Sequence, residues 1–224
     1  MKNIIGNVLM SFAILGWIKA EIVFPEDGVT LNYTHIMFRW TQEPDCNLYN
    51  LVVINSSNDT TVNVHTGRTM YIDQTNFNWG QGYVAILTPI YENENNAQTT
   101  DTISFNIGPA YTFADLNIEI INAEDTQDGL ALFSQVSPNF RMVAIDKLGN
   151  QVWNSEFAYI NHWNEHGQLF GMKDGRGVEV NFYDDILWMT PSGTEIDAHE
   201  IKQIPNGNYM GCLLYTSPSP RDVL

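Results

Sequence analysis

The chain has 224 residues, with 10 Lys or Arg against 26 Asp or Glu, a formal net charge of −16. Hydrophobic residues make up 44% and aromatic residues 12%, a composition typical of a globular protein of one or two domains. The acidic charge excludes binding to a nucleic-acid backbone or to an anionic membrane surface, because both require a surplus of cations. Only 16% of residues are charged and Asn is abundant, which is poor usage for helices and predicts an all-β fold of strands and turns.

Residues 1–20 are typical of a secretory signal peptide. Lys2 supplies the positive start, an apolar run covers residues 4–18, and Ala20 provides a small residue at the cleavage site. A buried strand and a retained single anchor are the alternatives, although the run is short for a full membrane span. The signal predicts a secreted or periplasmic protein without membrane association after cleavage.

Residues 22–108 show the regular succession of short strands and turns that is typical of a β-sandwich. Strands divided by turn residues are predicted around residues 36–40, 49–54, 82–87 and 102–107. An early Pro-x-x-Gly, the Phe-x-Trp strand ending at Trp40 and a later Tyr-x-Leu-x-Val strand together resemble a fibronectin type III-like domain. This resemblance implies packing rather than chemistry, so Trp40 and Tyr83 are expected in the core.

Residues 112–211 carry two predicted hairpins of similar form. The first runs from Met142 to Trp153 around an Asp-x-x-Gly turn, and the second covers residues 186–196. The separation of their turn glycines, Gly149 and Gly193, falls within the about 40–50 residues of a propeller blade. Two unrelated hairpins are the alternative to the start of a β-propeller.

The candidate chemistry lies just after the second predicted hairpin. Asp197-Ala198-His199-Glu200 is followed by a strand and by the tight turn of residues 205–208, Pro-Asn-Gly-Asn. A histidine flanked by carboxylates can act as a base, a nucleophile or a donor to an anion, and a hydrogen-bonded strand-end histidine is the alternative. His162 and His166 are interpreted as parts of a solvated loop, with an equivalent place in the preceding blade as the alternative.

Taken together, these motifs resemble the aryl-sulfate sulfotransferase family. The resemblance covers residues 112–211, the start of that family's propeller. The motifs are Asp128-Gly129-Leu130-x-Leu132-Phe133, Ile145-Asp146-x-x-Gly149-x-x-Val152-Trp153 and His199-x5-Pro205-Asn206-Gly207-Asn208. The family implies an exported β-propeller enzyme, often with an N-terminal β-sandwich. It transfers a sulfuryl group from a phenolic sulfate ester to a phenol through a sulfated histidine, without a nucleotide sulfate donor.

By this resemblance, His199 matches a histidine of the central funnel that binds the sulfuryl group. The nucleophilic histidine belongs to a later blade, which this chain lacks. Imidazolium and guanidinium groups suit the role because sulfuryl transfer spreads negative charge over oxygens. The implied partners are a phenolic sulfate and a phenol acceptor, with no cofactor and no metal. The rival hypothesis is a non-enzymatic extracellular propeller for binding or adhesion.

Residues 212–224 are predicted not to be natural sequence. The stretch from Cys212 to Asp222 resembles the translation of a sequencing adapter, and a natural Ser/Pro-rich tail is the alternative. The natural sequence is then expected to end near Gly211, which makes the chain an inactive fragment with an incomplete propeller. Cys46 is left single, either as a small buried hydrophobe or with a partner elsewhere. The acidic pairs around Asp128 and Asp184 are interpreted as turns, because their spacing is not that of a calcium loop.

Overall fold

The computed structural model describes residues 19–91, 99–111, 122, 124–135, 141–156 and 158–213. These residues form strands and turns without a helix, which confirms the predicted all-β class. None of them builds a helix with the length and hydropathy of a membrane span. The predicted signal segment, up to residue 18, and the tail from residue 214 lie outside the described residues.

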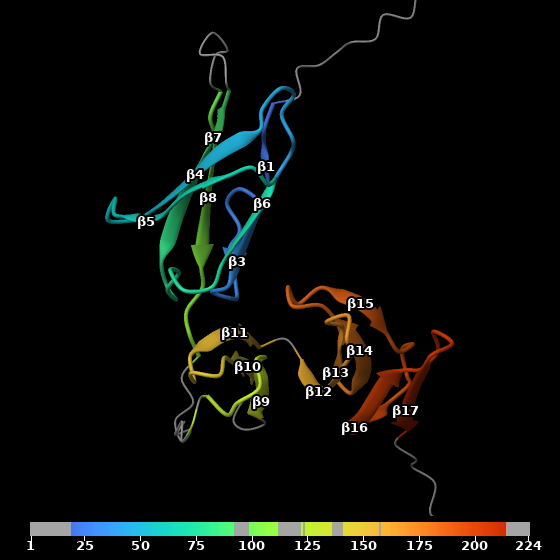
Figure 1. The fold of residues 1–224 in the computed structure, drawn as a ribbon. Coiled ribbons are helices and arrows are strands. Elements are labelled where there is room, and N and C mark those ends of the chain that lie inside the picture. The colour runs from blue at the N-terminus through green and yellow to red at the C-terminus, as the bar shows by residue number, and fades with distance from the viewer. Residues whose placement is uncertain are drawn as a thin grey trace, which may run out of the picture. The chain divides into compact units, whose positions relative to one another are not determined.

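Seventeen strands follow one another along the described part of the chain (Figure 1). They are β1 (Ile22–Phe24), β2 (Thr30–Leu31), β3 (Ile36–Trp40), β4 (Leu48–Asn55), β5 (Thr60–Thr66), β6 (Met70–Asp73), β7 (Gly82–Ile90), β8 (Asp101–Ile107), β9 (Ala131–Gln135), β10 (Arg141–Ile145), β11 (Gln151–Ser155), β12 (Tyr159–Trp163), β13 (Leu169–Lys173), β14 (Arg176–Val180), β15 (Ile186–Met189), β16 (Ile196–Gln203) and β17 (Tyr209–Leu213).

The chain divides into two compact units, which interleave along the sequence. Of the described residues, the first unit comprises those within 19–27, 37–72 and 83–104, and the second comprises those within 28–36, 73–82 and 105–213. The sequence analysis instead places a single boundary near residue 108.

The strands up to β8 form two sheets with the orders β1-β3-β6 and β2-β8-β7-β4-β5. Side chains along β3 and β7 alternate between buried and less buried, so one face of each sheet packs into a core. Trp40 on β3 meets Tyr49 on β4 edge to face, with ring centroids 5.6 Å apart, and so joins the two sheets. This division of strands is that of a fibronectin type III-like sandwich, and Trp40 and Tyr83 are buried, as predicted.

The second unit contains three further antiparallel sheets that follow each other in chain order. Their strand orders are β11-β10-β9, β12-β13-β14-β15 and β16-β17. A buried apolar cluster formed by β10 to β14 packs the first of these sheets against the second. Phe170, Ile196 and Ile201 are buried together and pack the second sheet against the third. Successive sheets therefore stack face to face.

The first predicted hairpin is present, and the second is not. β10 and β11 pair as an antiparallel hairpin, as the Asp-x-x-Gly turn indicates. Residues 186–196 instead lead from β15 in the four-stranded sheet to β16 in the next sheet. β15 is paired with β14, and Ile196 is paired with Leu213. A turn sequence specifies that the chain reverses, but packing decides which strand becomes the neighbour.

Residues 32–34 extend the first of these three sheets at its β11 edge. Tyr33 forms an antiparallel bridge with Trp153, and the Thr34 N–H donates to the Val152 carbonyl at 2.9 Å. A segment more than a hundred residues earlier in the chain thus gives the sheet a fourth, short member.

Candidate functional site

The predicted motif around His199 forms a wide bulge in β16. Ile196 pairs with Leu213, whereas Ile201 pairs with Gly211, so β16 holds more residues than β17 between these two pairs. Both isoleucines are buried and anchor the ends of the bulge. Residues 197–200 between them leave the regular ladder, which re-aims the side chains of Asp197, His199 and Glu200.

Asp197 and His199 form an oriented pair within this bulge. The His199 N–H donates to Asp197 Oδ1 at 2.8 Å, and ring Nδ1 contacts the same carboxylate oxygen. These two hydrogen bonds hold the pKa of Asp197 below its ordinary value. The His199 side chain is 86% exposed. With Nδ1–H directed at the carboxylate, Nε2 is free for proton transfer, nucleophilic attack or anion binding.

Glu200 lies at the end of the bulge and pairs with a lysine of the same strand. Its Oε1 accepts from Lys202 Nζ at 2.9 Å. The bond from Lys202, the charge of Lys202 and the charge of His162 lower the pKa of Glu200. β12 and β16 are in contact, and each is the first strand of its sheet.

His162 therefore lies on a strand and not in a loop, which corrects the interpretation from sequence. It occupies β12, with its ring 5.8 Å from that of Phe170. The signal that could have placed it is the alternation just before it, where the apolar Ala158 and Ile160 alternate with Tyr159 and Asn161. His166 does lie in a turn, where its N–H donates to Asn164 Oδ1 at 3.0 Å.

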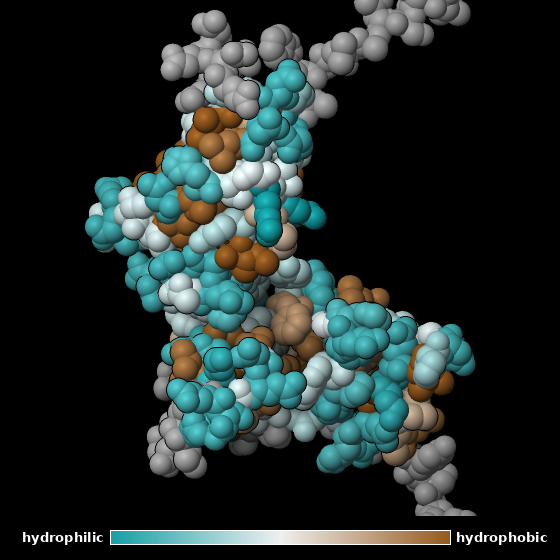
Figure 2. Space-filling model, in the orientation of Figure 1, coloured by the Kyte–Doolittle hydropathy of each residue, from teal (hydrophilic) through white to brown (hydrophobic). Residues whose placement is uncertain are grey.

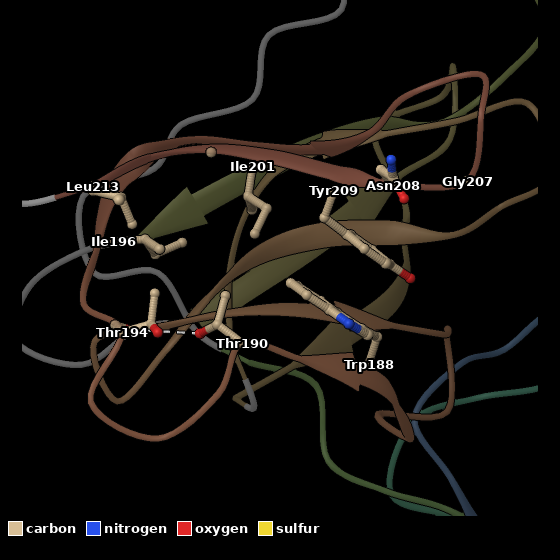
Figure 3. Close-up of a pocket in the computed structure, with 10 residues that line it drawn as sticks. Trp188, Thr190, Thr194, Ile196, Ile201, Gly207, Asn208, Tyr209 and Leu213 are labelled. Carbon is tan, nitrogen blue, oxygen red and sulfur yellow. Dashed lines mark hydrogen bonds between the residues drawn. The ribbon is translucent and has the colours of Figure 1, made fainter.

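A groove of about 700 Å³ runs between the β16–β17 hairpin and the end of the four-stranded sheet. Figure 3 shows Ile196, Ile201 and Tyr209 pointing from the hairpin toward Trp188 and Thr190. The rings of Trp188 and Tyr209 stack with centroids 3.6 Å apart and planes 3° from parallel. The groove is thus lined by aromatic and aliphatic side chains together with the polar side chains of Thr190, Thr194 and Asn208. His199 is not among its lining residues.

A buried carboxylate supports the aromatic wall of the groove. Glu179 is 3% exposed and accepts hydrogen bonds from Gln168 Nε2 and from the Tyr209 hydroxyl. Burial and then the bond to Glu179 raise the pKa of Tyr209 to about 12. Tyr209 therefore stays protonated and serves as a donor that compensates the buried acid.

Acidic residues and cysteines of the described part do not gather into a metal centre. No group of three or more His, Cys, Asp or Glu side chains there is placed to hold a metal ion. Asp184 lies in a turn, as predicted, and accepts from Ser155 Oγ at 2.6 Å. Cys46 and Cys212 are both free thiols, and buried Cys46 donates to the Leu48 carbonyl at 3.1 Å.

Comparison with known proteins adds little to this picture. No protein-family model and no curated protein matches the chain. Among solved structures, it is similar to a segment of two fibronectin type III domains from chicken tenascin. The sequence identity is 10% and the TM-score is 0.28, over 88% of this chain and 98% of that one. A likeness at this TM-score carries no argument, so the fold rests on the strand orders and the site on its own geometry.

Proposed function

We propose that this chain is the N-terminal part of an exported aryl-sulfate sulfotransferase, with a β-sandwich followed by the first blades of a β-propeller. The reaction moves a sulfuryl group from a phenolic sulfate ester to a phenol through a sulfohistidine. The observation that carries the proposal is His199, which a carboxylate orients at a bulge in the first strand of its sheet.

The arrangement of the sheets supports the propeller part of the proposal. The four-stranded sheet β12-β13-β14-β15 is a meander in chain order, which is the form of a blade. Sheets in chain order stack face to face, as neighbouring blades do. The first strands of consecutive blades line a common channel, and here β12 and β16 hold His162 and the bulge around His199.

The chemistry assigned to His199 is binding of the sulfuryl group. The oxygens of this group carry negative charge, which increases as the bond from sulfur to the phenolic oxygen breaks. The Asp197 carboxylate orients the imidazole through Nδ1, which leaves Nε2 of His199 to donate to a sulfuryl oxygen when it carries a proton. The nucleophilic histidine is assigned to a later blade, as the family resemblance implies.

Replacement of His199 tests this assignment in the protein that contains the whole propeller. His199→Ala is expected to lower turnover of p-nitrophenyl sulfate with a phenol acceptor by about 10²–10³-fold, because one donor to the developing charge is lost. Release of p-nitrophenolate measures the rate. Asp197→Asn is expected to lower it less, because the ring stays but loses its counter-charge. His166→Ala, which alters an exposed turn histidine, is the matched control. An unchanged rate in His199→Ala would remove His199 from the site.

The 224-residue chain itself is expected to be inactive in the same assay, because two or three blades do not enclose a funnel. Sulfuryl transfer by this chain would contradict the proposal.

A second candidate is a non-enzymatic extracellular binding module. The observation that favours it is the groove with the stacked Trp188 and Tyr209, which does not include His199. Ligand binding without sulfuryl transfer by the protein that contains the whole propeller would support this candidate.

A further inference from the structure

The first two described residues, Lys19 and Ala20, are built into the sandwich that follows them. Ala20 is 1% exposed, and its N–H donates to Glu43 Oε2 at 3.0 Å. The Lys19 carbonyl accepts from Thr41 Oγ1 at 2.9 Å, and Lys19 Nζ lies 3.2 Å from Asp101 Oδ1. All of these residues belong to the first unit. Both residues therefore have defined partners within the fold.

Thr41 and Asp101 each bind both Lys19 and the residues that lead into β1. Thr41 Oγ1 donates to the Lys19 carbonyl and accepts from the Glu21 N–H, each at 2.9 Å. Asp101 uses one carboxylate oxygen for Lys19 Nζ and the other for the Ile22 N–H, which lies 2.8 Å away. These two side chains therefore position the start of β1 through residue 19 as well as through residues 21 and 22.

We infer that Lys19 and Ala20 belong to the mature protein, so that removal of an N-terminal leader leaves both residues on the sandwich. The cleavage after Ala20 that the sequence predicts would instead take a cation from Asp101 and a backbone donor from Glu43. It would also uncover the surface that buried Ala20 covers. The segment Ile18-Lys19-Ala20 departs from an Ala-x-Ala-like cleavage site, because its first residue is large. The inference does not rest on the proposed sulfuryl transfer.

The charge balance of the chain makes the loss of Lys19 costly. Hydrophilic residues cover much of the surface seen in Figure 2, and the charged residues of the chain are 26 acidic and 10 basic ones. The Asp101 side chain is 19% exposed, so its carboxylate is partly removed from water. A carboxylate at such a position that loses a cation keeps its desolvation cost without the compensating attraction. Lys19 is therefore part of the electrostatic balance of the sandwich.

The first test compares hydrogen exchange in two chains that begin at Lys19 and at Glu21, each released from a removable N-terminal fusion. The Thr41 N–H donates to the Glu21 carbonyl at 3.0 Å and reports whether this segment stays on the sandwich. In the shorter chain we expect the Thr41 amide to exchange at least tenfold faster. Lys147→Ala, which removes an exposed ion pair with Asp128, is the control for loss of a lysine and is expected to leave this rate unchanged. Equal rates in the two chains would mean that the new α-ammonium group of Glu21 replaces the lost contacts, and would overturn the inference.

The second test reads the N-terminus of the exported protein. The 224-residue chain is expressed in a bacterial host, and the protein recovered from the periplasm or the medium is analysed by intact mass and N-terminal sequencing. We expect the first residue to be Lys19 or a residue before it. Ile18→Ala completes an Ala-x-Ala-like site and is the control, which is expected to yield chain that begins at Glu21 and shows the fast Thr41 exchange of the first test. Glu21 as the first residue of the unaltered protein contradicts the inference, whatever the protein's activity.

Discussion

Asp184 stands at a turn position that glycine occupies in three other hairpins of this molecule. Its φ of 66° lies in the left-handed region, like those of Gly149, Gly167 and Gly207. A non-glycine residue there is strained, and the bond from Ser155 Oγ compensates. Burial raises the pKa of Asp184 in spite of this bond. The residue thus carries an electrostatic cost at neutral pH.

Asp184→Asn is expected to stabilise the protein at pH 7. The pKa of Asp184 is higher in the folded state than in the unfolded state. Above the folded-state pKa, ionisation of Asp184 therefore disfavours the folded state. Below the unfolded-state pKa, the carboxyl is protonated in both states and has no such effect. Asn tolerates the left-handed conformation and still accepts from Ser155. Thermal unfolding followed from pH 3 to pH 8 checks this, since the gain should be largest at the high end and disappear at the low end, below the ordinary pKa of Asp. A gain that does not depend on pH would contradict the electrostatic explanation.

At the scale of elements, one type of hairpin turn recurs in the described part of the chain. The N–H of its first residue donates to the carbonyl of its fifth, and the N–H of the fourth donates back to the carbonyl of the first. In the turn of residues 146–150 both distances are 3.0 Å. The other examples are residues 55–59, 164–168, 181–185 and 204–208. Where Asn or Asp comes first, its side chain also accepts from the N–H groups of the third and fifth residues, as Asp146 does.

Gly207→Ala tests the backbone requirement of this turn. No atom lies within 4 Å of the added Cβ, but φ is 83°, so the only cost is conformational. We expect a loss of about 1–2 kcal/mol in the free energy of unfolding, measured by urea denaturation. Gly207→Asn is the control and should lose less, because Asn enters the left-handed region more easily. Equal losses in the two variants would point to a cause other than φ.

At the scale of the whole molecule, residues 32–34 bind parts of the second unit that are distant in sequence. The Asn154 N–H donates to the Asn32 carbonyl at 2.9 Å, next to the bond between Thr34 and Val152. The sheet of β9 to β11 therefore depends on a segment that precedes it by a hundred residues.

Thr34→Pro is expected to detach this segment from β11, because proline has no N–H to donate and Thr34 is buried. The loss should be about 1–3 kcal/mol, with faster hydrogen exchange at the Asn154 amide. Asn32→Ala removes only the bond from Asn32 Nδ2 to the Asn154 carbonyl and should cost less. Unchanged protection of the Asn154 amide in Thr34→Pro would show that this pairing does not hold the sheet.

The candidate site was predictable only in part. The order Asp197, Ala198, His199 places a carboxylate two residues before the imidazole, and the short-range contact between them follows from this spacing. The placement of His162 on a strand beside the bulge does not, because it depends on β12 lying next to β16.

By itself, the sequence determined the all-β class, the sandwich strands with Trp40 buried between their sheets, and the hairpin of residues 142–153. These features depend on local rules, namely the two-residue alternation of strands and the conformational preferences of Gly, Asn and Asp. Only the tertiary structure decided that β15 and β16 belong to different sheets and that residues 32–34 join β11. Strand partners distant in sequence are selected by the burial of whole faces, and a short pattern of residues specifies a face without specifying what covers it.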